Sequence, residues 1–343
     1  MANANWFLKF PGTIVHHLQC TSSDHLPLYI NLLGLEFPPW KKVFRFEEMW
    51  LTDVWCAEMV EASWSSYSQG YRDDAIIKKV EQCGKDLTWW NHNIFGNVRK
   101  ELAKKKELLV VAEMEAQIHG QNAWLRALKE EINTLLDKEA HMWSQRSCTL
   151  WLKNGDNNTK FFHCRATKRF KKNLIRGIMD EDNNWRVEPC EIATHLINYY
   201  QELFTSSNPI SHGAALEYIP RVITDHMNAA LAAPFQVEEV KEALKQMAPL
   251  KAPRPDGMPP LFYQHFWGLV DNDVTNSVLS WLNSGTIPYP LNHTFVTLIP
   301  KTKNPEYVTQ YRPISLCNVL YKIFSKVLAN RLKKILPTII TEN

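Results

Sequence analysis

The sequence lacks the cysteine spacing of a zinc site. Its seven cysteines over 343 residues form no C-x-x-C pair. This absence excludes the common zinc-finger and zinc-ribbon sites, and the odd count argues against a disulfide framework. We therefore expect no metal site in the chain. Reduced thiols are typical of an intracellular protein, whether nuclear or cytoplasmic.

Long apolar runs are also missing. No run approaches the roughly 20 residues that cross a bilayer, and the first residues lack the basic and then apolar pattern of a signal peptide. We therefore expect no membrane partner. Glycine is sparse, at 12 residues, while 45% of the residues are hydrophobic and 22% are charged. This composition excludes fibrous and disordered chains and predicts a globular protein with a sizeable core.

Strong net charge is the third absence, because the formal value is only +3. The positive residues are nevertheless concentrated in two blocks, 146–176 and 301–334, with Asp156 and Glu306 as their only acids. Such blocks favour polyanion partners, RNA or DNA, although a solvated basic face is the plain alternative. The candidate phosphate-binding residues of the first block are Lys160, Arg165, Lys168, Arg169, Lys171 and Lys172.

The strongest helical pattern covers residues 97–145. Asn97 is a plausible N-cap, no proline interrupts the span, and Leu125, Leu128, Ile132, Leu135 and Met142 follow 3-4-3-7 spacing. Gly120 marks a weak point. The pattern predicts two helices, or one kinked helix, that fold back as a hairpin or self-associate with a partner chain.

Other segments are predicted from turn residues and periodicity. Two short strands are expected within 13–18 and 26–33, and an aromatic core within 40–95. A β-hairpin is expected over 175–187 and a further strand at 295–299. Further helices are expected over 189–204, 236–247, 261–284 and 317–336. The fold class is therefore α+β and mostly helical.

Three short motifs contain residues suited to chemistry. Asp24 and His25 lie in Ser-Asp-His, where a carboxylate can orient an imidazole for acid–base work. Residues 251–257 read Lys-Ala-Pro-Arg-Pro-Asp-Gly, a rigid turn. Lys301 ends the 295–301 strand, and Arg312 begins the next apolar segment, so the two cations are expected to project from one hairpin and bind phosphate oxygens. Each motif alone also fits an ordinary surface residue, loop or hairpin.

Taken in order, these motifs resemble the polyprotein of plant LINE (non-LTR) retrotransposons over essentially the whole chain. Residues 1–36 resemble the end of the endonuclease domain. Residues 37–225 resemble the helical connecting region, on the motifs at 44–50 and 152–163. Residues 226–343 resemble the amino-terminal fingers of the reverse transcriptase, on the motifs at 251–257, 295–301, 311–316 and 329–332.

The resemblance implies roles residue by residue. Asp24 and His25 match the pair that takes part in strand cleavage, while Lys301 and Arg312 match the cations that bind the incoming nucleotide. The intact family enzyme uses Mg²⁺ held by palm aspartates. After Lys301 the only acids are Glu306 and Glu342, so the chain is expected to be an inactive fragment of an RNA-directed DNA polymerase. Arg254 also departs from the glycine usual at that position, and would be strained if φ there is positive.

Two other functions fit the same residues. One is a non-catalytic helical module that binds nucleic acid through phosphates. The other is an interaction protein that self-associates through 97–145.

Overall fold

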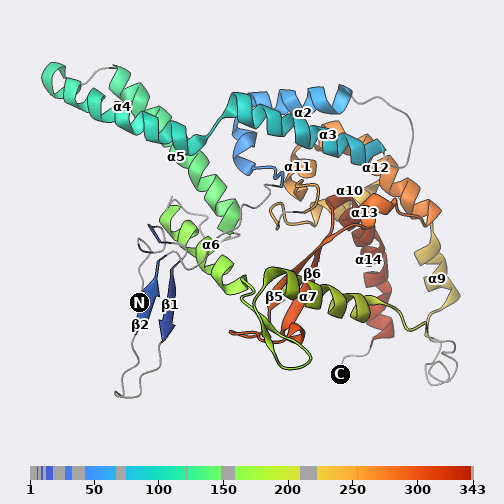
Figure 1. The fold of residues 1–343 in the computed structure, drawn as a ribbon. Coiled ribbons are helices and arrows are strands. Elements are labelled where there is room, and N and C mark those ends of the chain that lie inside the picture. The colour runs from blue at the N-terminus through green and yellow to red at the C-terminus, as the bar shows by residue number, and fades with distance from the viewer. Residues whose placement is uncertain are drawn as a thin grey trace, which may run out of the picture. The chain divides into compact units, whose positions relative to one another are not determined.

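The computed structural model describes residues 6, 9–10, 13–17, 28–32, 43–66, 75–120, 123–147, 159–208, 222–252 and 254–340. The described elements are mostly helical with six short strands in three two-stranded sheets, which confirms the predicted α+β class (Figure 1). Two compact units form. The first comprises 1–68, 79–171 and 250–252, and the second comprises 69–78, 172–249 and 253–343. No helix within the described ranges is long and apolar enough to span a bilayer.

The first unit begins with an antiparallel hairpin and continues as helices. Its elements are β1 (Ile14–His17), β2 (Leu28–Asn31), η1 (Glu48–Thr52), α2 (Val54–Ser66), α3 (Ala75–Trp90), the π-turn Asn91–Phe95, α4 (Val98–His119), α5 (Ala123–Ser147) and α6 (Thr159–Asn173). In the β1–β2 pair Ile14 lies opposite Asn31, so the two predicted strands are confirmed. Helices α3 and α6 each continue into the second unit.

An aromatic cluster forms the core beside η1, as the sequence predicts. Phe46 and Trp50 meet edge to face at 5.4 Å, and Trp50 meets Trp90 at 6.0 Å. All three are almost fully buried. The Trp50 indole donates to Asn91 Oδ1 at 3.2 Å, so its polar edge is satisfied. Trp55, by contrast, is 62% exposed and takes no part in this core.

The segment before η1 is held to the end of α5. Gln145 Nε2 donates to the Phe46 carbonyl at 2.8 Å, and Gln145 Oε1 accepts from the Glu48 amide at 2.9 Å. Arg146 donates to the buried carboxylate of Glu47 at 3.1 Å. The residues in these contacts are nearly a hundred positions apart in the sequence. The contacts hold the 44–50 motif against the end of α5, a neighbour that the sequence does not predict.

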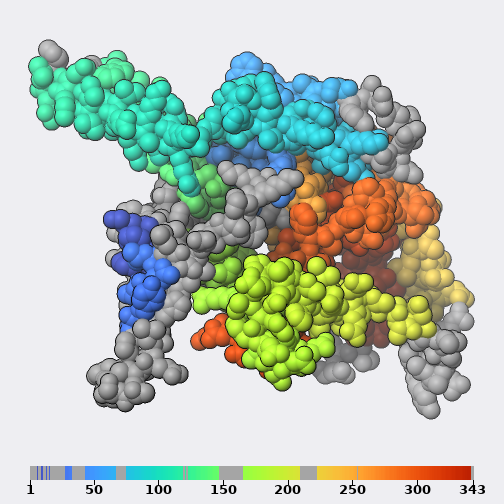
Figure 2. All heavy atoms as spheres, in the orientation of Figure 1, coloured from blue at the N-terminus to red at the C-terminus, as the bar shows by residue number. Residues whose placement is uncertain are grey.

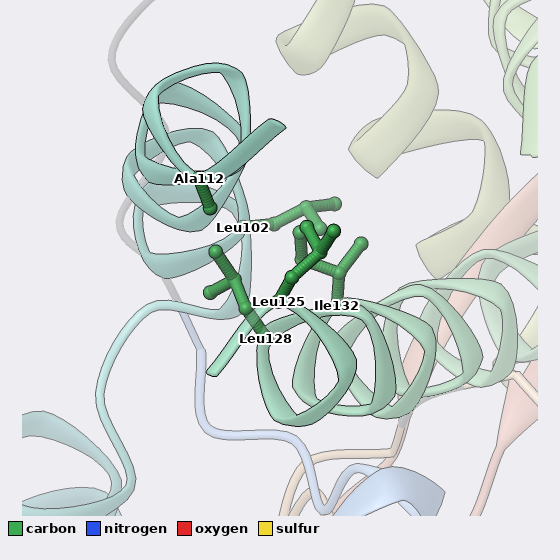
Figure 3. Close-up of a cluster of buried hydrophobic side chains, with 5 residues drawn as sticks. All are labelled: Leu102, Ala112, Leu125, Leu128 and Ile132. Atoms are coloured by element: carbon green, nitrogen blue, oxygen red, sulfur yellow. The ribbon is translucent and has the colours of Figure 1, made fainter. Parts of the chain in front are cut away.

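The α4–α5 hairpin confirms the prediction for 97–145. Asn97 Oδ1 accepts from the amides of Arg99 and Lys100, which caps α4, and Gly120 ends the helix with a φ of +81°. The predicted leucine seam packs within one chain: Figure 3 shows Leu125, Leu128 and Ile132 of α5 directed at α4. A partner chain would therefore have to use another face of the hairpin.

The second unit is a helical group with two hairpins. Its elements are β3 (Ile178–Met179), β4 (Trp185–Arg186), α7 (Pro189–Phe204), α9 (Asp225–Ala232), α10 (Val237–Lys245), α11 (Pro260–His265), α12 (Trp267–Ser284), α13 (Tyr289–Asn292), β5 (Phe295–Pro300), η3 (Val308–Gln310), β6 (Tyr311–Leu316) and α14 (Val319–Ile339). Helix α14 packs on α10, α12, α13 and α9. Its buried residues recur every fourth position and form one face.

The predicted helix over 261–284 is in fact two helices. Phe266 leaves the helical conformation, with φ −94° and ψ 22°, and separates α11 from α12. The two hairpins of this unit are joined through backbone, because the Met179 amide donates to the Glu306 carbonyl at 2.8 Å. Tyr307 also donates to Asn183 Oδ1 at 3.4 Å.

Candidate phosphate-binding surfaces

Helix α6 presents a row of cations on one face. Arg165, Lys168, Arg169 and Lys172 are spaced i, i+3, i+4 and i+7, so they project from the same side of the helix. All four side chains are exposed. A helical row of this kind matches the regular negative charge of a nucleic-acid backbone.

The other two predicted cations of this block differ. Lys171 is half-buried and lies on another side of α6, where its Nζ donates to the Thr13 carbonyl at 3.2 Å. It therefore holds the helix to the strand segment. Lys160 lies in the first turn of α6, and its side chain is outside the described residues. Four of the six candidate cations thus share one exposed face of α6, and Lys160 stays a prediction.

Lys301 and Arg312 lie on the same face of the β5–β6 hairpin. Arg312 is directly opposite Ile299, and the Lys301 amide donates to the Gln310 carbonyl at 2.8 Å, which continues the ladder by one residue. Side chains two apart on a strand, and those directly opposite, point the same way. The register therefore places both cations on one face of the hairpin, and their binding of a nucleotide stays a prediction.

The two cations are not equally available. Lys301 Nζ donates to the Thr309 carbonyl at 2.7 Å and closes the turn of the hairpin. The Arg312 side chain is exposed and forms no hydrogen bond or ion pair within the described part of the chain. A phosphate could thus meet the Arg312 guanidinium directly, but it would have to displace the Thr309 carbonyl from Lys301.

Residues 254–257 of the 251–257 motif form a tight turn. The Gly257 amide donates to the Arg254 carbonyl at 3.0 Å, and Gly257 has a φ of +69°. The Met258 amide then donates to Asp256 Oδ1 at 3.1 Å, which is the local bond that favours aspartate in turns. The positive φ falls on the glycine at 257 and not on Arg254, so the condition for backbone strain at Arg254 is not met.

Arg254 has a different cost, because its side chain is buried. It is 3% exposed, and its Nε has no hydrogen-bond partner among the residues that the structure describes. Burial lowers the pKa of Arg254 and raises the pKa of Asp256 to about 6. The positive charge of Arg254 acts against that rise. The turn therefore contains a desolvated cation beside a carboxyl group that titrates well above its ordinary range.

Arg331 is a central contact that the sequence did not predict, although it lies in the 329–332 motif. Its Nε and Nη2 bind the two oxygens of Glu239 at 2.8 and 2.7 Å. Its remaining donors meet the carbonyls of Leu231, Ala233 and Pro234.

All five guanidinium donors of Arg331 are thus used, and the group stacks 3.7 Å from the Phe235 ring. Hydrogen bonding to Arg331 lowers the pKa of Glu239. Arg331 therefore fastens the α9–α10 connection to α14, and no donor remains for a ligand.

Two predictions fall beyond what the structure describes. Asp24 and His25 lie outside the described residues, so the cleavage pair stays a prediction. The Mg²⁺ that the family resemblance implies also stays a prediction; within the described ranges no group of three or more His, Cys, Asp or Glu could hold a metal ion.

Three known proteins are similar to the chain. The uncharacterized 149 kDa protein of transposon TX1 from Xenopus laevis is 28% identical over 341 residues, which cover 93% of this chain and 25% of the relative. The RNA-directed DNA polymerase from mobile element jockey of Drosophila melanogaster is 26% identical, over 68% of this chain and 25% of the relative.

The third relative is the retrovirus-related Pol polyprotein from type-1 retrotransposable element R2 of Bradysia coprophila. It is 24% identical over 47% of this chain and 18% of the relative. No family model matches the chain. The chain spans a quarter or less of the length of these relatives, which are proteins of mobile elements.

Proposed function

We propose that this chain is part of a non-LTR retrotransposon polyprotein, of the LINE type that plants carry, and that it holds nucleic acid beside the fingers of an RNA-directed DNA polymerase. The similarity to mobile-element proteins supports the general assignment. The observation that carries the nucleic-acid role is the row of Arg165, Lys168, Arg169 and Lys172 on one exposed face of α6.

The α6 face binds phosphates by charge and without base recognition. Arginine and lysine on one side of a helix supply point charges and planar forks to a backbone. Contacts of this kind position a nucleic acid and carry no sequence information. Binding should therefore weaken steeply with salt, because each neutralised phosphate releases counterions.

A matched pair of double variants tests this role. Lys168→Ala/Lys172→Ala removes two lysines spaced i, i+4 on α6, and Lys241→Ala/Lys245→Ala removes two exposed lysines with the same spacing on α10. Binding to single-stranded RNA is measured by anisotropy over a range of salt. The α6 variant should lose about 5-fold affinity per lost contact near 0.1 M salt and flatten the salt slope by about 1.4.

The control variant has the same net charge as the α6 variant. It therefore distinguishes binding at the α6 face from attraction of RNA to the overall charge of the protein. Equal losses in the two variants would reject the α6 face. Arg165→Ala/Arg169→Ala provides a second test of the same face and should match the Lys168/Lys172 result. Wild-type binding that is indifferent to salt would reject the nucleic-acid role altogether.

We also propose that these 343 residues do not polymerise by themselves. The only acidic residues after Lys301 in this sequence are Glu306 and Glu342. Phosphoryl transfer by two metal ions needs several carboxylates that converge on the ions. The test is primer extension on an RNA template with Mg²⁺ and nucleotides, for which we expect no product. Extension that Arg312→Ala abolishes would contradict this proposal.

A further inference from the structure

The outer face of α4 is apolar where a solvated helix would be polar. Val111, Met114 and Ile118 are 50%, 61% and 77% exposed. Their spacing of three and four residues places them in one stripe along the helix. Leu108 and Val110 are also exposed and flank this stripe. The stripe lies in the last turns of α4, before Gly120. Figure 2 shows the surface of the α4–α5 hairpin.

This stripe is not the face that closes the hairpin. Leu102, Leu109, Ala112 and Ala116 pack against α5, as Figure 3 shows for Leu102 and Ala112, and they lie on the opposite side of α4. Helix α4 is therefore apolar on two sides, which is typical of a helix between two packed neighbours.

Helix α5 provides the comparison within the same hairpin. Its exposed positions beyond the first turn are almost all polar, and they include Arg126, Lys129, Glu130, Asn133, Thr134 and Asp137. The exposed apolar stripe is thus particular to α4 and is not a general property of the hairpin.

The charges of α4 indicate what covers the stripe. Residues 98–106 contain five Lys or Arg and one Glu, whereas residues 107–117 contain three Glu and no cation. Arg99, Lys105 and Glu113 form ion pairs with α5. By helical spacing, Lys104 and Glu115 lie on the same edge of the apolar stripe, Lys104 toward the start of α4 and Glu115 toward its end. Neither forms an ion pair within the described residues. A surface with this asymmetry is complementary to itself when a second copy runs in the opposite direction.

We propose that the outer face of α4 binds the same face of a second copy of this chain, with the two helices antiparallel. A two-fold axis near Leu108–Val111 brings Lys104 of each copy beside Glu115 of the other and sets the exposed side chains of Leu108 and Val111 of the two copies against each other. A parallel arrangement would set like charges together. The leucines at 125, 128 and 132 remain inside each hairpin.

Exposed valines give a sharp test that leaves the fold intact. Sedimentation equilibrium of the full chain should show a dimer that dissociates on dilution. Val111→Asp should raise its dissociation constant about 10-fold or more, because Val111 lies beside the two-fold axis. Val237→Asp is the matched control, because Val237 is an equally exposed valine on α10, and it should leave the dimer unchanged. Circular dichroism should be the same for all three proteins.

A charge exchange tests the antiparallel direction. Lys104→Glu alone and Glu115→Lys alone should each weaken self-association, because each places like charges across the axis. A mixture of the two variants should restore a dimer, because the glutamate introduced in one variant then lies opposite the lysine introduced in the other. A mixture that stays monomeric would overturn the antiparallel arrangement.

Three further results would overturn the proposal. The first is a wild-type chain that stays monomeric up to hundred-micromolar concentration, and the second is a dimer that Val111→Asp leaves intact. The third is a monomer whose RNA affinity falls in Val111→Asp, which would assign the stripe to nucleic acid. The α6 variants are measured in parallel, so failure of this dimer and failure of RNA binding are distinguished.

Discussion

The two basic blocks look alike in the sequence and differ in the structure. In the first, four cations stand exposed on one face of α6. In the second, Arg331 is buried and fully hydrogen-bonded, Lys301 is held by a carbonyl, and Arg312 is exposed. A count of positive charge therefore does not distinguish a binding surface from a structural clamp.

The difference arises from what lies opposite each cation. The side chains of Arg165, Arg169 and Lys172 on α6 are exposed, and a cation that meets water can exchange that water for a ligand. Arg331 lies on the buried face of α14, where its charge is tolerated only because Glu239 and three carbonyls satisfy it. The same residue type thus stabilises the fold in one block and remains available in the other.

The largest expected effect is on stability, from Arg331→Ala. Removing the guanidinium leaves Glu239 and three carbonyls without their donor, so we expect a loss of about 2–4 kcal/mol in the free energy of unfolding. Urea titration followed by circular dichroism measures the change. Arg331→Lys should recover little of it, because an ammonium cannot bind two carboxylate oxygens and three carbonyls at once.

Arg169→Ala is the matched arginine on α6, and its cost should stay within about 0.5 kcal/mol. If the two variants unfold at the same urea concentration, Arg331 is not a clamp and the contrast between the blocks is lost.

The second expected effect is a pH dependence from the 251–257 turn. The pKa of Asp256 is raised by burial from 3.8 to about 6, so the folded state holds its proton more tightly than the unfolded state. The contribution of Asp256 to the free energy of unfolding should be greatest below about pH 4. It should fall by about 2–3 kcal/mol as the pH rises to about 6. The difference between wild type and Asp256→Asn, followed by urea unfolding at several pH values, isolates this contribution.

Asparagine can keep the bond from the Met258 amide, so Asp256→Asn should remove the pH dependence and preserve the turn. Arg254→Met should shift the fall in stability to higher pH, because the Arg254 charge holds the pKa of Asp256 down. Identical profiles for wild type and Asp256→Asn would show that this carboxyl group is not desolvated.

Much of the local fold could be predicted, because its signals are local. The cap at Asn97, the break at Gly120 and the start of α7 at Pro189 follow from the residues themselves. Helix α6 could not be predicted from hydrophobic periodicity, because residues 150–173 show none. The only local signal for this helix is that residues 159–173 contain no glycine or proline. The break at Phe266 has no glycine or proline to signal it.

The candidate sites were predictable to a smaller extent. The shared face of Lys301 and Arg312 follows from strand alternation and a short hairpin. The Thr309 contact of Lys301 and the Arg331 clamp do not, because they depend on turn geometry and on a carboxylate 92 positions upstream. The exposed apolar stripe of α4 could not be predicted. The sequence shows that apolar residues recur along α4, but it does not show which of them pack against the leucines of α5.

The smallest expected effect separates the two cations of the β5–β6 hairpin. Arg312→Ala should weaken binding of a nucleoside triphosphate about 10-fold, because a charge-assisted bond to phosphate is lost. Lys301→Ala should weaken it only about 2-fold, since wild-type Lys301 must first give up its bond to the Thr309 carbonyl. Fluorescence titration with a labelled triphosphate measures both, and Arg312→Lys should fall between them. If Lys301→Ala has the larger effect, Lys301 leaves the turn when nucleotide binds, and the hairpin observed here is the state that precedes binding.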